Sequence, residues 1–555
     1  MLIAATHPCD SAGTPPGPTG AASGAGRLRR AKCLCLALAL VGCEDFPDAP
    51  TSTVTVREPS DAPWPQEVFV KNTFVLTMDV EGQGAAAITG LAVDWRSTDP
   101  SVLALSPVEA GPTHEDSLVA QRSIRVVAQR RGRAEISATI VQPGIEAGSL
   151  KQEVRVMERW IAVSAGGTHT CGLTIDHSAL CWGEGFLGNG SVAGSVIPTP
   201  VLSDLTFKTL AAGDSFTCGL TLDGTGYCWG ENERTGRLGN GTLVNYLVPA
   251  PVASGITFSS IWAGAAHACA LADDAGYCWG SDIEGQLGDA HLNFNQPPGM
   301  FDPPFDNCAK TIGAILRCSM TPRRIRPTRD ADGPILLRAI GPGEDHTCGV
   351  LTTGAAVCWG NHARWGNLLL TSSDSAIPVP TTIAFDSVTS GVWHSCAIEH
   401  DTAKVRCWGY NTYGQLGNAT DAPVSGCDTA PCSLVPVLVA GEHAFRQVSA
   451  DGFTTCGVVD TGAGFCWGAD DLGQLGNDSS PLVTTCRGVV CSKVPLPVEM
   501  PSGSSLVSIS VGRSHTCAVD ALGAAYCWGR GTEGQLGSGS AKGSTIPLRV
   551  REPSD

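Results

Sequence analysis

Apolar and polar residues alternate in short stretches over the first third of the chain. Within residues 91–105 (LAVDWRSTDPSVLAL), apolar and polar residues alternate on both sides of a turn. A second such pattern starts at residues 126–128, passes through a turn at residues 131–133 and continues in residues 134–140. An alternation with a period of two is typical of β-strands that bury one face. The pattern therefore predicts a small all-β module over residues 54–158, a segment that contains no cysteine.

Composition extends the all-β prediction to the rest of the chain. The 555 residues include 67 Gly and 36 Pro, whereas charged residues make up only 16%. A chain that is rich in turn formers and poor in Lys and Glu favours many short strands over long helices. Its length predicts two or three domains.

From Trp160 onward, one unit is repeated seven times, and its cysteines mark each copy. Every copy contains Cys-Trp-Gly, and another cysteine precedes it by ten residues in five copies, nine in one and eleven in one. The pairs are Cys171 and Cys181, Cys218 and Cys228, Cys269 and Cys278, Cys348 and Cys358, Cys396 and Cys407, Cys456 and Cys466, and Cys517 and Cys527.

This spacing predicts a β-hairpin in each copy. Residues ten apart face each other across two antiparallel strands that are joined by a three-residue loop, and Gly224, Gly354, Gly462 and Gly523 stand where such a loop needs a left-handed residue. The nine-residue gap leaves the two-residue loop Asp273-Asp274. Facing strand residues are near enough for a disulfide, so we expect one per copy. Reduced, buried cysteine pairs are the alternative.

Other positions recur around each cysteine pair. Glycine stands five residues before the first cysteine in six copies, with Asp451 in the remaining one, and Gly-x-Leu-Gly follows Trp-Gly in six. The composite G-x-x-H-T-C-x-L-x-x-x-G-x-x-x-C-W-G-x-n-x-x-G-Q-L-G resembles the regulator-of-chromosome-condensation repeat, over roughly residues 160–550.

That resemblance implies a seven-bladed β-propeller over residues 159–551, with one blade per copy. The tryptophans of Cys-Trp-Gly would fill the space between neighbouring blades. They are Trp182, Trp229, Trp279, Trp359, Trp408, Trp467 and Trp528. The last apolar strand, residues 546–550, has no hairpin after it. We therefore expect it to complete the blade begun at Trp160 and so to close the ring.

The cysteine-free module has a resemblance of its own. The string W-x-S-x-D-P-S-V from Trp95 to Val102, followed by a G-x-A-x-I-x-A strand, is similar to the group 2 bacterial immunoglobulin-like domain. This resemblance implies an immunoglobulin-like β-sandwich over residues 54–158. Such modules are stalks or spacers in surface proteins.

Three copies are longer than the others, and all three are extended at one point, after Gly-x-Leu-Gly. The insertions span about residues 289–335, 419–443 and 478–498, and each carries one further cysteine pair. These pairs are Cys308 and Cys318, Cys427 and Cys432, and Cys486 and Cys491. Equivalent positions of a propeller lie on one face, so three disulfide-stapled loops would form a recognition surface there. Loops stabilised only against proteolysis are the alternative.

Histidine stands two residues before the first cysteine in five copies. These residues are His169, His267, His346, His394 and His515, with Phe216 and Thr454 in the other two copies. A ring of histidines suggests metal binding, but positions related by the repeat are too far apart to share one ion. We expect no metal, and hydrogen bonds from each histidine to the backbone of its own blade.

The N-terminus has the features of an export signal. Residues 27–43 (RLRRAKCLCLALALVGC) place a basic cluster before an apolar run too short to span a bilayer. Its ending, Leu40-Val41-Gly42-Cys43, resembles the bacterial lipobox. We expect residues 1–42 to be a lipoprotein signal peptide, Cys43 to be lipidated and residues 43–53 to be a tether in the cell envelope, at the outer membrane or cell surface. An ordinary cleaved signal peptide with a chance cysteine is the alternative.

Charge and missing motifs narrow the function. A formal charge of −17 disfavours binding to nucleic acid, and 24 cysteines indicate an oxidising compartment. The sequence has no H-E-x-x-H, P-loop, G-x-S-x-G or EF-hand motif. We therefore expect a non-catalytic, adhesin-like binding scaffold that recognises an extracellular or periplasmic protein or glycan, with no cofactor and no small GTPase or nucleic acid as partner. The alternatives are an inhibitor of a hydrolase, as in some secreted bacterial propellers of this repeat family, and an enzyme with its site at the propeller channel.

Overall fold

The computed structural model describes residues 54–57, 63–82, 92–108, 119–142, 145–290, 306–311, 314–327, 335–361, 372–420, 431–478 and 480–553. The chain divides into two compact units, residues 1–158 and 159–555. In the described part of the chain, every regular element is a β-strand, and no helix is long and apolar enough to cross a lipid bilayer.

The first unit consists of two four-stranded sheets, ordered β1-β3-β6-β5 and β2-β8-β7-β4. Consecutive strands such as β4 and β5, or β6 and β7, belong to different sheets, so the chain crosses between the sheets at these turns. The strands are β1 (Val54–Arg57), β2 (Glu67–Phe69), β3 (Thr73–Gly82), β4 (Ala92–Ser97), β5 (Leu103–Pro107), β6 (Val119–Ala128), β7 (Gly132–Gln142) and β8 (Ile145–Met157).

The alternating pattern of this unit places every second side chain in its core. On β7, Ala134, Ile136, Ala138 and Ile140 are buried, and the residues between them are more exposed. Trp64 packs against Trp95 with their ring centroids 5.5 Å apart. Both sheets are thus apolar on one face, as the period of two predicted.

The second unit contains seven sheets, and each is built from strands that are consecutive in sequence. Sheet 1 consists of β9 (Trp160–Ala165), β10 (His169–Thr174), β11 (Ala179–Gly183) and β12 (Ser195–Pro200), and sheet 2 of β13 (Phe207–Ala212), β14 (Phe216–Thr221), β15 (Gly226–Gly230) and β16 (Tyr246–Pro251). Sheet 3 consists of β17 (Ser260–Ala263), β18 (His267–Ala272), β19 (Ala275–Ser281), β20 (Asp306–Thr311) and β21 (Ala314–Arg324), and sheet 4 of β22 (Leu337–Pro342), β23 (His346–Leu351), β24 (Ala356–Gly360) and β25 (Ser373–Pro378). Sheet 5 consists of β26 (Phe385–Ser390), β27 (His394–Glu399), β28 (Val405–Tyr410) and β29 (Cys432–Leu438). Sheet 6 consists of β30 (Phe445–Asp451), β31 (Thr454–Val459), β32 (Gly464–Ala469), β33 (Thr484–Cys486) and β34 (Val489–Pro497), and sheet 7 of β35 (Leu506–Val511), β36 (His515–Asp520), β37 (Ala525–Gly529) and β38 (Ser544–Arg549).

The hairpin between the second and third strands of each sheet has the predicted geometry. Gly224, Gly354, Gly462 and Gly523 occupy the third loop position with φ between 83° and 93°, in the left-handed region that glycine enters without strain. The short loop Asp273-Asp274 has positive φ at both residues, 47° and 62°, as a two-residue hairpin turn requires. These turns set the register that brings the two cysteines of each copy directly opposite each other.

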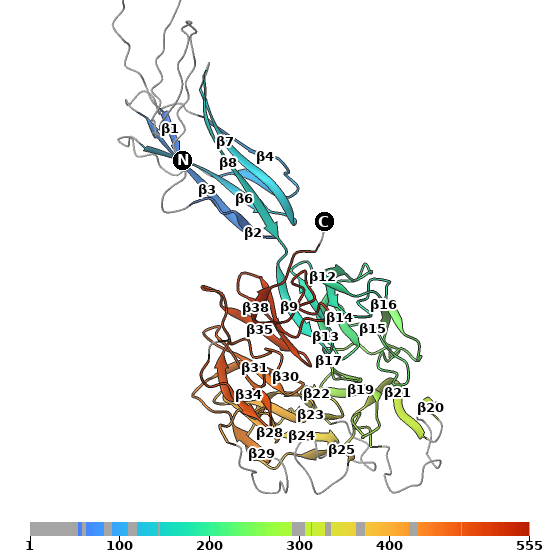
Figure 1. The fold of residues 1–555 in the computed structure, drawn as a ribbon. Coiled ribbons are helices and arrows are strands. Elements are labelled where there is room, and N and C mark those ends of the chain that lie inside the picture. Colours follow the sequence, from blue (N-terminus) through green and yellow to red (C-terminus); the bar gives the residue numbers. More distant parts are fainter. Residues whose placement is uncertain are drawn as a thin grey trace, which may run out of the picture. The chain divides into compact units, whose positions relative to one another are not determined.

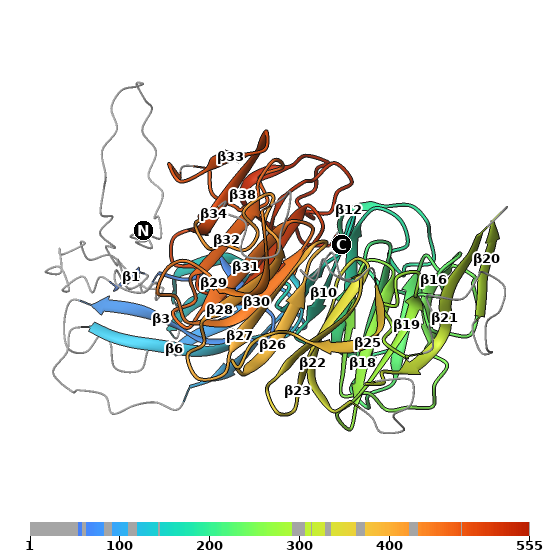
Figure 2. The ribbon, with the colours of Figure 1, turned by 90° about the horizontal axis from the view of Figure 1, so that it is seen from below.

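The seven sheets surround a common channel. The first strand of every sheet lines it, namely β9, β13, β17, β22, β26, β30 and β35. The sheets follow one another around this channel in the order of the sequence (Figure 1), and Figure 2 shows the same sheets from a direction turned by 90°. Each sheet contacts the next, and β9 of sheet 1 contacts both β35 and β36 of sheet 7.

The expectation that the last strand completes the first sheet is wrong. β38 pairs with β37 inside sheet 7, and sheet 1 obtains its fourth strand, β12, from the residues that follow its own Cys-Trp-Gly. The ring closes instead through contacts between two complete sheets. The Arg513 amide donates to the Gly166 carbonyl (3.2 Å), and the Ala165 amide donates to the Ser510 hydroxyl (3.0 Å).

Candidate functional site

The recurring cysteines form disulfides across the second and third strands of every sheet in the second unit. Their Cα atoms are 4.0 or 4.1 Å apart, and all of these side chains are buried. Each pair faces directly across its ladder, at Cys171–Cys181 and at the six equivalent positions. Each sheet therefore has a covalent cross-link between its two central strands.

The seven Cys-Trp-Gly tryptophans are fully buried and pack between neighbouring sheets. Each glycine that ends a Gly-x-Leu-Gly string lies against the tryptophan of the next sheet, as Gly188 does with Trp229 and Gly537 with Trp182. The indole N–H of Trp182, 2.9 Å from the Gln535 carbonyl oxygen, donates to it across the junction of sheets 7 and 1. Trp359, Trp467 and Trp528 make the same bond to Gln286, Gln415 and Gln474, and Trp279 donates to the Arg237 carbonyl.

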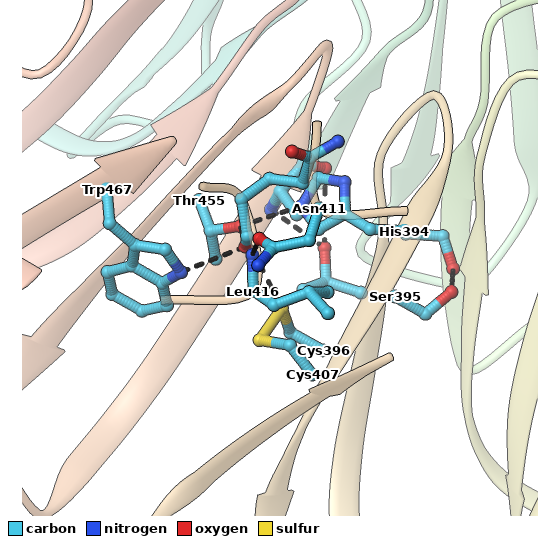
Figure 3. The surroundings of a disulfide bond; sticks show 12 residues. His394, Ser395, Cys396, Cys407, Asn411, Leu416, Thr455 and Trp467 are labelled. Atoms are coloured by element: carbon cyan, nitrogen blue, oxygen red, sulfur yellow. Dashed lines mark hydrogen bonds between the residues drawn. A yellow bond between two sulfur atoms is a disulfide. The ribbon is translucent and has the colours of Figure 1, made fainter. Parts of the chain in front are cut away.

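The five recurring histidines also cross these junctions, which corrects the expectation that they bond to the backbone of their own blade. His394 Nε2 lies 2.7 Å from the hydroxyl oxygen of Thr455 in the next sheet. The Thr455 hydroxyl donates in turn to the Gln415 carbonyl (3.3 Å), which also accepts the Trp467 N–H (Figure 3). Because the hydroxyl proton points at that carbonyl, Nε2 must carry the imidazole proton.

The same contact recurs at four more junctions. His169 reaches Thr217, His267 reaches Thr347, His346 reaches Ser395, and His515 reaches Thr170, at distances of 2.7 to 3.1 Å. Burial lowers the pKa of His267, His394 and His515 to about 3 and that of His169 to about 4, so these rings are neutral. Among the residues that the structure describes, no group of three or more His, Cys, Asp or Glu side chains could hold a metal ion.

Two junctions lack the histidine, and at each of them a second recurring residue is also changed. Phe216 replaces histidine in sheet 2, and the residue that would supply the hydroxyl in sheet 3 is Ala268. Thr454 replaces histidine in sheet 6, and Asp451 replaces the glycine three residues earlier. The residue between each histidine position and the first cysteine is therefore a contact residue that the sequence analysis missed. The joint occurrence of Phe216 and Ala268 was the available signal.

Few ionisable side chains occur among the described residues that line the channel. Its volume is about 320 Å³, and small, hydroxyl and apolar residues line it, with Asp451 as the one ionisable side chain among the described lining residues. Burial, and then the charge of Asp214, raise the pKa of Asp451 to about 7. At this end of the channel, Arg513 of sheet 7 forms ion pairs with Asp214 of sheet 2 (2.6 Å) and Glu344 of sheet 4 (3.2 Å). The guanidinium thus bridges three sheets.

The three insertions emerge from that same end of the sheets. Each lies between the third and fourth strands of sheet 3, 5 or 6, and in an antiparallel meander this connection is at the same end as the one that carries Arg513. Disulfide Cys308–Cys318 joins β20 to β21, and Cys486–Cys491 joins β33 to β34. Cys432, at the start of β29, is disulfide-bonded, and Cys427 lies outside the described residues. We call the surface that carries these insertions the loop face.

The repeats match known families. Residues 160–189, 207–234, 385–415 and 506–535 match one model of the regulator of chromosome condensation (RCC1) repeat, and residues 223–271, 461–519 and 523–555 match a second. The chain is similar to the ultraviolet-B receptor UVR8 of Arabidopsis thaliana, with 26% identity over 401 residues that cover 70% of this chain and 80% of the receptor. It is 33% identical over 190 residues to the human probable E3 ubiquitin-protein ligase HERC4, which covers 33% of this chain but only 16% of the ligase.

Solved structures show a similar fold. The structure of Prp20p from Saccharomyces cerevisiae has a TM-score of 0.54 at 21% identity and covers 68% of this chain and 87% of Prp20p. Human WBSCR16 has a TM-score of 0.50 at 20% identity and covers 67% of this chain and 90% of that protein. At these identities, the likeness concerns the fold alone.

Proposed function

Because this chain belongs to the proteins that are built from RCC1 repeats, we propose that its second unit is a seven-bladed β-propeller that binds a protein or glycan partner through the loop face. Each of the seven sheets is one blade. The partner lies outside the cytoplasm, and neither nucleic acid nor a small GTPase is expected, because the chain is acidic and rich in cysteine.

The observation that carries this proposal is the placement of the insertions. Three blades are extended, all at the connection between the third and fourth strands, and two of the extensions are described as hairpins that a disulfide closes. A cross-linked loop loses less conformational entropy when it binds, and three such loops on one face provide a preorganised contact surface. Among similar proteins, yeast RCC1 (Prp20) has been solved bound to Kap60, which is consistent with a binding role for this fold.

The channel supports catalysis less well than the loop face supports binding. Glycoside hydrolysis needs two carboxyl groups on either side of the scissile bond, and acyl transfer needs a nucleophile, a base and an orienting group. The described lining residues offer only Asp451 as an ionisable group. We therefore propose a non-catalytic scaffold.

Site-specific crosslinking tests this proposal. A photo-crosslinking amino acid at Thr485, on the stapled hairpin of sheet 6, is expected to capture a partner from the native cell envelope. The matched control places it at Leu522, an exposed residue in the hairpin loop at the opposite end of the sheets. Crosslinks at Leu522 but not at Thr485 would contradict a binding role for the loop face.

We further propose that the chain is an exported lipoprotein, with Cys43 as the lipidated residue and residues 54–158 as an immunoglobulin-like spacer. Cys43 lies outside the described residues, and the proposal rests on the lipobox-like sequence and on the cysteine pairs. Intact mass before and after reduction tests it on protein from the native envelope. A diacylglyceryl mass on Cys43 together with ten reducible disulfides is expected. An unprocessed N-terminus and free thiols at all twenty cysteines that follow Cys43 would overturn it.

A further inference from the structure

Among the described residues, one backbone hydrogen bond recurs at the loop face at five of the seven junctions between neighbouring sheets. Two residues after Gly-x-Leu-Gly, an amide donates to a carbonyl on the outer side of the following sheet. The acceptor is the residue that comes directly after the ladder partner of that sheet's Cys-Trp-Gly glycine. These pairs are Gly190 to Leu247, Gly241 to Met320, Ala290 to Asp374, Ala419 to Lys493 and Gly539 to Val196, at 2.8 to 3.0 Å. We call this the strap bond.

The strap bond requires a left-handed backbone at its donor. All five donors are Gly or Ala, and their φ values lie between 56° and 82°. Glycine enters this region without cost, and alanine does so at a cost that the bond offsets. The junction from sheet 4 to sheet 5 falls on residues 362–371, which lie outside the described residues.

The junction between sheets 6 and 7 has no strap bond. Its donor position is Asp478, which is not among the residues with positive φ, and its acceptor position is Thr545. Thr545 lies between the ladder pairs Gly529–Ser544 and Cys527–Leu548, where the register shifts. Among the described residues, no backbone amide of sheet 6 donates to the Thr545 carbonyl.

A groove of about 850 Å³ opens at this junction. It lies between the stapled insertion of sheet 6 and the start of β38, and we call it the seam groove. Its described lining residues include the carboxylates Asp470, Asp471 and Asp478, and none of them is Lys or Arg. Leu472 and Val490 also line it, and each is 42% exposed. Lys542 precedes the lining residues Gly543 to Thr545 and is exposed.

The residues that line the seam groove indicate the chemistry of a ligand that would fit it. The exposed Thr545 carbonyl has no donor from sheet 6 and can accept an N–H, and β38 is the outermost strand of its sheet, so an extended backbone can lie along it. Three carboxylates favour a cationic side chain. The exposed Leu472 and Val490 fit the aliphatic stem of lysine or arginine, which packs on apolar surface while its charge stays near oxygen atoms.

We propose that the seam groove binds an extended, lysine- or arginine-bearing polypeptide segment of the partner. The segment replaces the missing strap bond with one of its own amides and places its cations against Asp470, Asp471 and Asp478. This inference rests on the proposed function and names the chemistry of the partner.

The protonation of Asp470 agrees with a cationic ligand. Burial, and then the charges of Asp471 and Asp478, raise the pKa of Asp470 to about 6, although the Leu475 amide that donates to it lowers the pKa. A bound cation favours the ionised carboxylate, so binding takes up no proton above pH 7 and releases one near pH 6. Affinity is therefore expected to rise from pH 5 to pH 7.

Titration of the full chain with three probes tests the proposal. They are the peptide acetyl-Val-Lys-Val-Lys-Val-amide, the same peptide with methylated backbone nitrogens, and the polyamine spermine. The unmodified peptide is expected to bind, and the other two are expected to bind at least about tenfold more weakly, since a factor of ten corresponds to roughly one good hydrogen bond. Equal affinity for the methylated peptide or for spermine would overturn capture of a peptide backbone.

Two substitutions of Asp478, at the donor position of the missing strap bond, distinguish the effect of its negative charge from the effect of closing the groove with a strap bond. Asp478→Asn removes one charge, whereas Asp478→Gly also supplies the residue that forms a strap bond at other junctions. Asp478→Gly is therefore expected to weaken peptide binding at least about tenfold more than Asp478→Asn does. Glu184→Gln, a loop-face carboxylate at a junction that has its strap bond, is the matched control and should bind like the wild type.

The outcomes separate this inference from the function on which it rests. Unchanged peptide affinity in Asp478→Gly, with the variant melting like the wild type, would overturn the seam groove as the site. Crosslinks at Thr485 without any peptide binding would overturn the groove and leave the loop face as the binding surface.

Discussion

Glycine precedes each buried histidine by three residues because a side chain there would collide with the imidazole ring. A Cβ atom on Gly264 would lie 2.9 Å from Cε1 of His267, and one on Gly512 would lie 2.9 Å from Cε1 of His515. In sheet 6, the glycine is replaced by Asp451 and the histidine by the smaller Thr454. The two positions therefore change together for a steric reason.

This coupling predicts the behaviour of a pair of substitutions in sheet 6. Thr454→His alone should destabilise the protein, because the new ring meets Asp451. Adding Asp451→Gly should reverse the loss, since Thr516 already presents a hydroxyl that donates to the Gln474 carbonyl (2.9 Å). A coupling free energy of about 1 to 3 kcal/mol is expected for such neighbours. Urea unfolding of the four proteins measures it, and strictly additive effects would contradict the steric explanation.

The buried histidines also predict a pH dependence. Burial lowers the pKa of His394 to about 3 from its ordinary value of 6.5, so the unfolded chain takes up a proton before the folded chain does. The stabilising contribution of neutral His394 is complete above pH 6.5 and is lost as the pH falls toward 3. Between pH 7 and pH 5 the loss is about 2 kcal/mol.

A non-titrating variant isolates this effect from the acidic groups, which contribute in both senses: the pKa of Asp451 is raised by burial, whereas the pKa of Glu399 is lowered, since burial is outweighed there by hydrogen bonds and nearby cations. The free energy of unfolding of the wild type minus that of His394→Gln should fall by about 2 kcal/mol from pH 7 to pH 5. Denaturant titrations at both pH values provide the comparison. A difference that does not change with pH would mean that His394 takes up its proton as readily in the folded protein as in the unfolded chain.

Among the elements, the two-residue hairpin of sheet 3 holds strain that the other hairpins avoid. Asp273 and Asp274 both have positive φ, 47° and 62°, which costs an L-residue about 1 kcal/mol or more relative to glycine. Asp274→Gly is expected to remove this strain and so to stabilise the protein by about 0.5 to 1 kcal/mol. The greater conformational entropy of glycine in the unfolded chain reduces this gain. The hydrogen bond from the Leu337 amide to the residue 274 carbonyl is kept.

The opposite substitution in sheet 2 is the control for this prediction. Gly224→Asp should be destabilising, because a Cβ atom there would lie 2.7 Å from the Phe258 carbonyl oxygen. Thermal unfolding of both variants gives the signs. Equal effects in the two hairpins would show that the φ values do not control turn stability.

The sequence was sufficient for features that depend on local spacing. The gap between paired cysteines gave the register of each hairpin, and Gly-x-Leu-Gly marked the turn that packs on the next tryptophan, because both are properties of a few consecutive residues. The partner of each histidine was mispredicted, because it belongs to the next copy, some fifty residues away in most cases. The assignment of the last strand was also wrong, since a repeat pattern looks the same whether the fourth strand stays in its own sheet or joins its neighbour.

For the molecule as a whole, complete sheets mean that no strand is shared between the first and last repeats. Closure depends on the same contacts as the other junctions. At the junction of sheets 7 and 1, His515 reaches Thr170, Trp182 donates to the Gln535 carbonyl, and Gly539 forms the strap bond. The junction that closes the ring therefore has the same kinds of contact as the junctions within the chain, so we do not expect it to open before them.

The weakest junction is expected between sheets 6 and 7, where both the histidine and the strap bond are missing. At the loop face, local opening of this junction requires fewer contacts to be lost. Amide hydrogens around Thr545 should therefore exchange with deuterium faster than those around Val196, which occupies the equivalent position at the junction of sheets 7 and 1, where both contacts are present. Hydrogen–deuterium exchange of the full chain measures both segments in one experiment. Asp478→Gly should slow exchange near Thr545 and leave Val196 unchanged. Faster exchange at Val196 than at Thr545 would instead locate the opening at the closure between sheets 7 and 1, and the strap bond would not be what holds neighbouring sheets together.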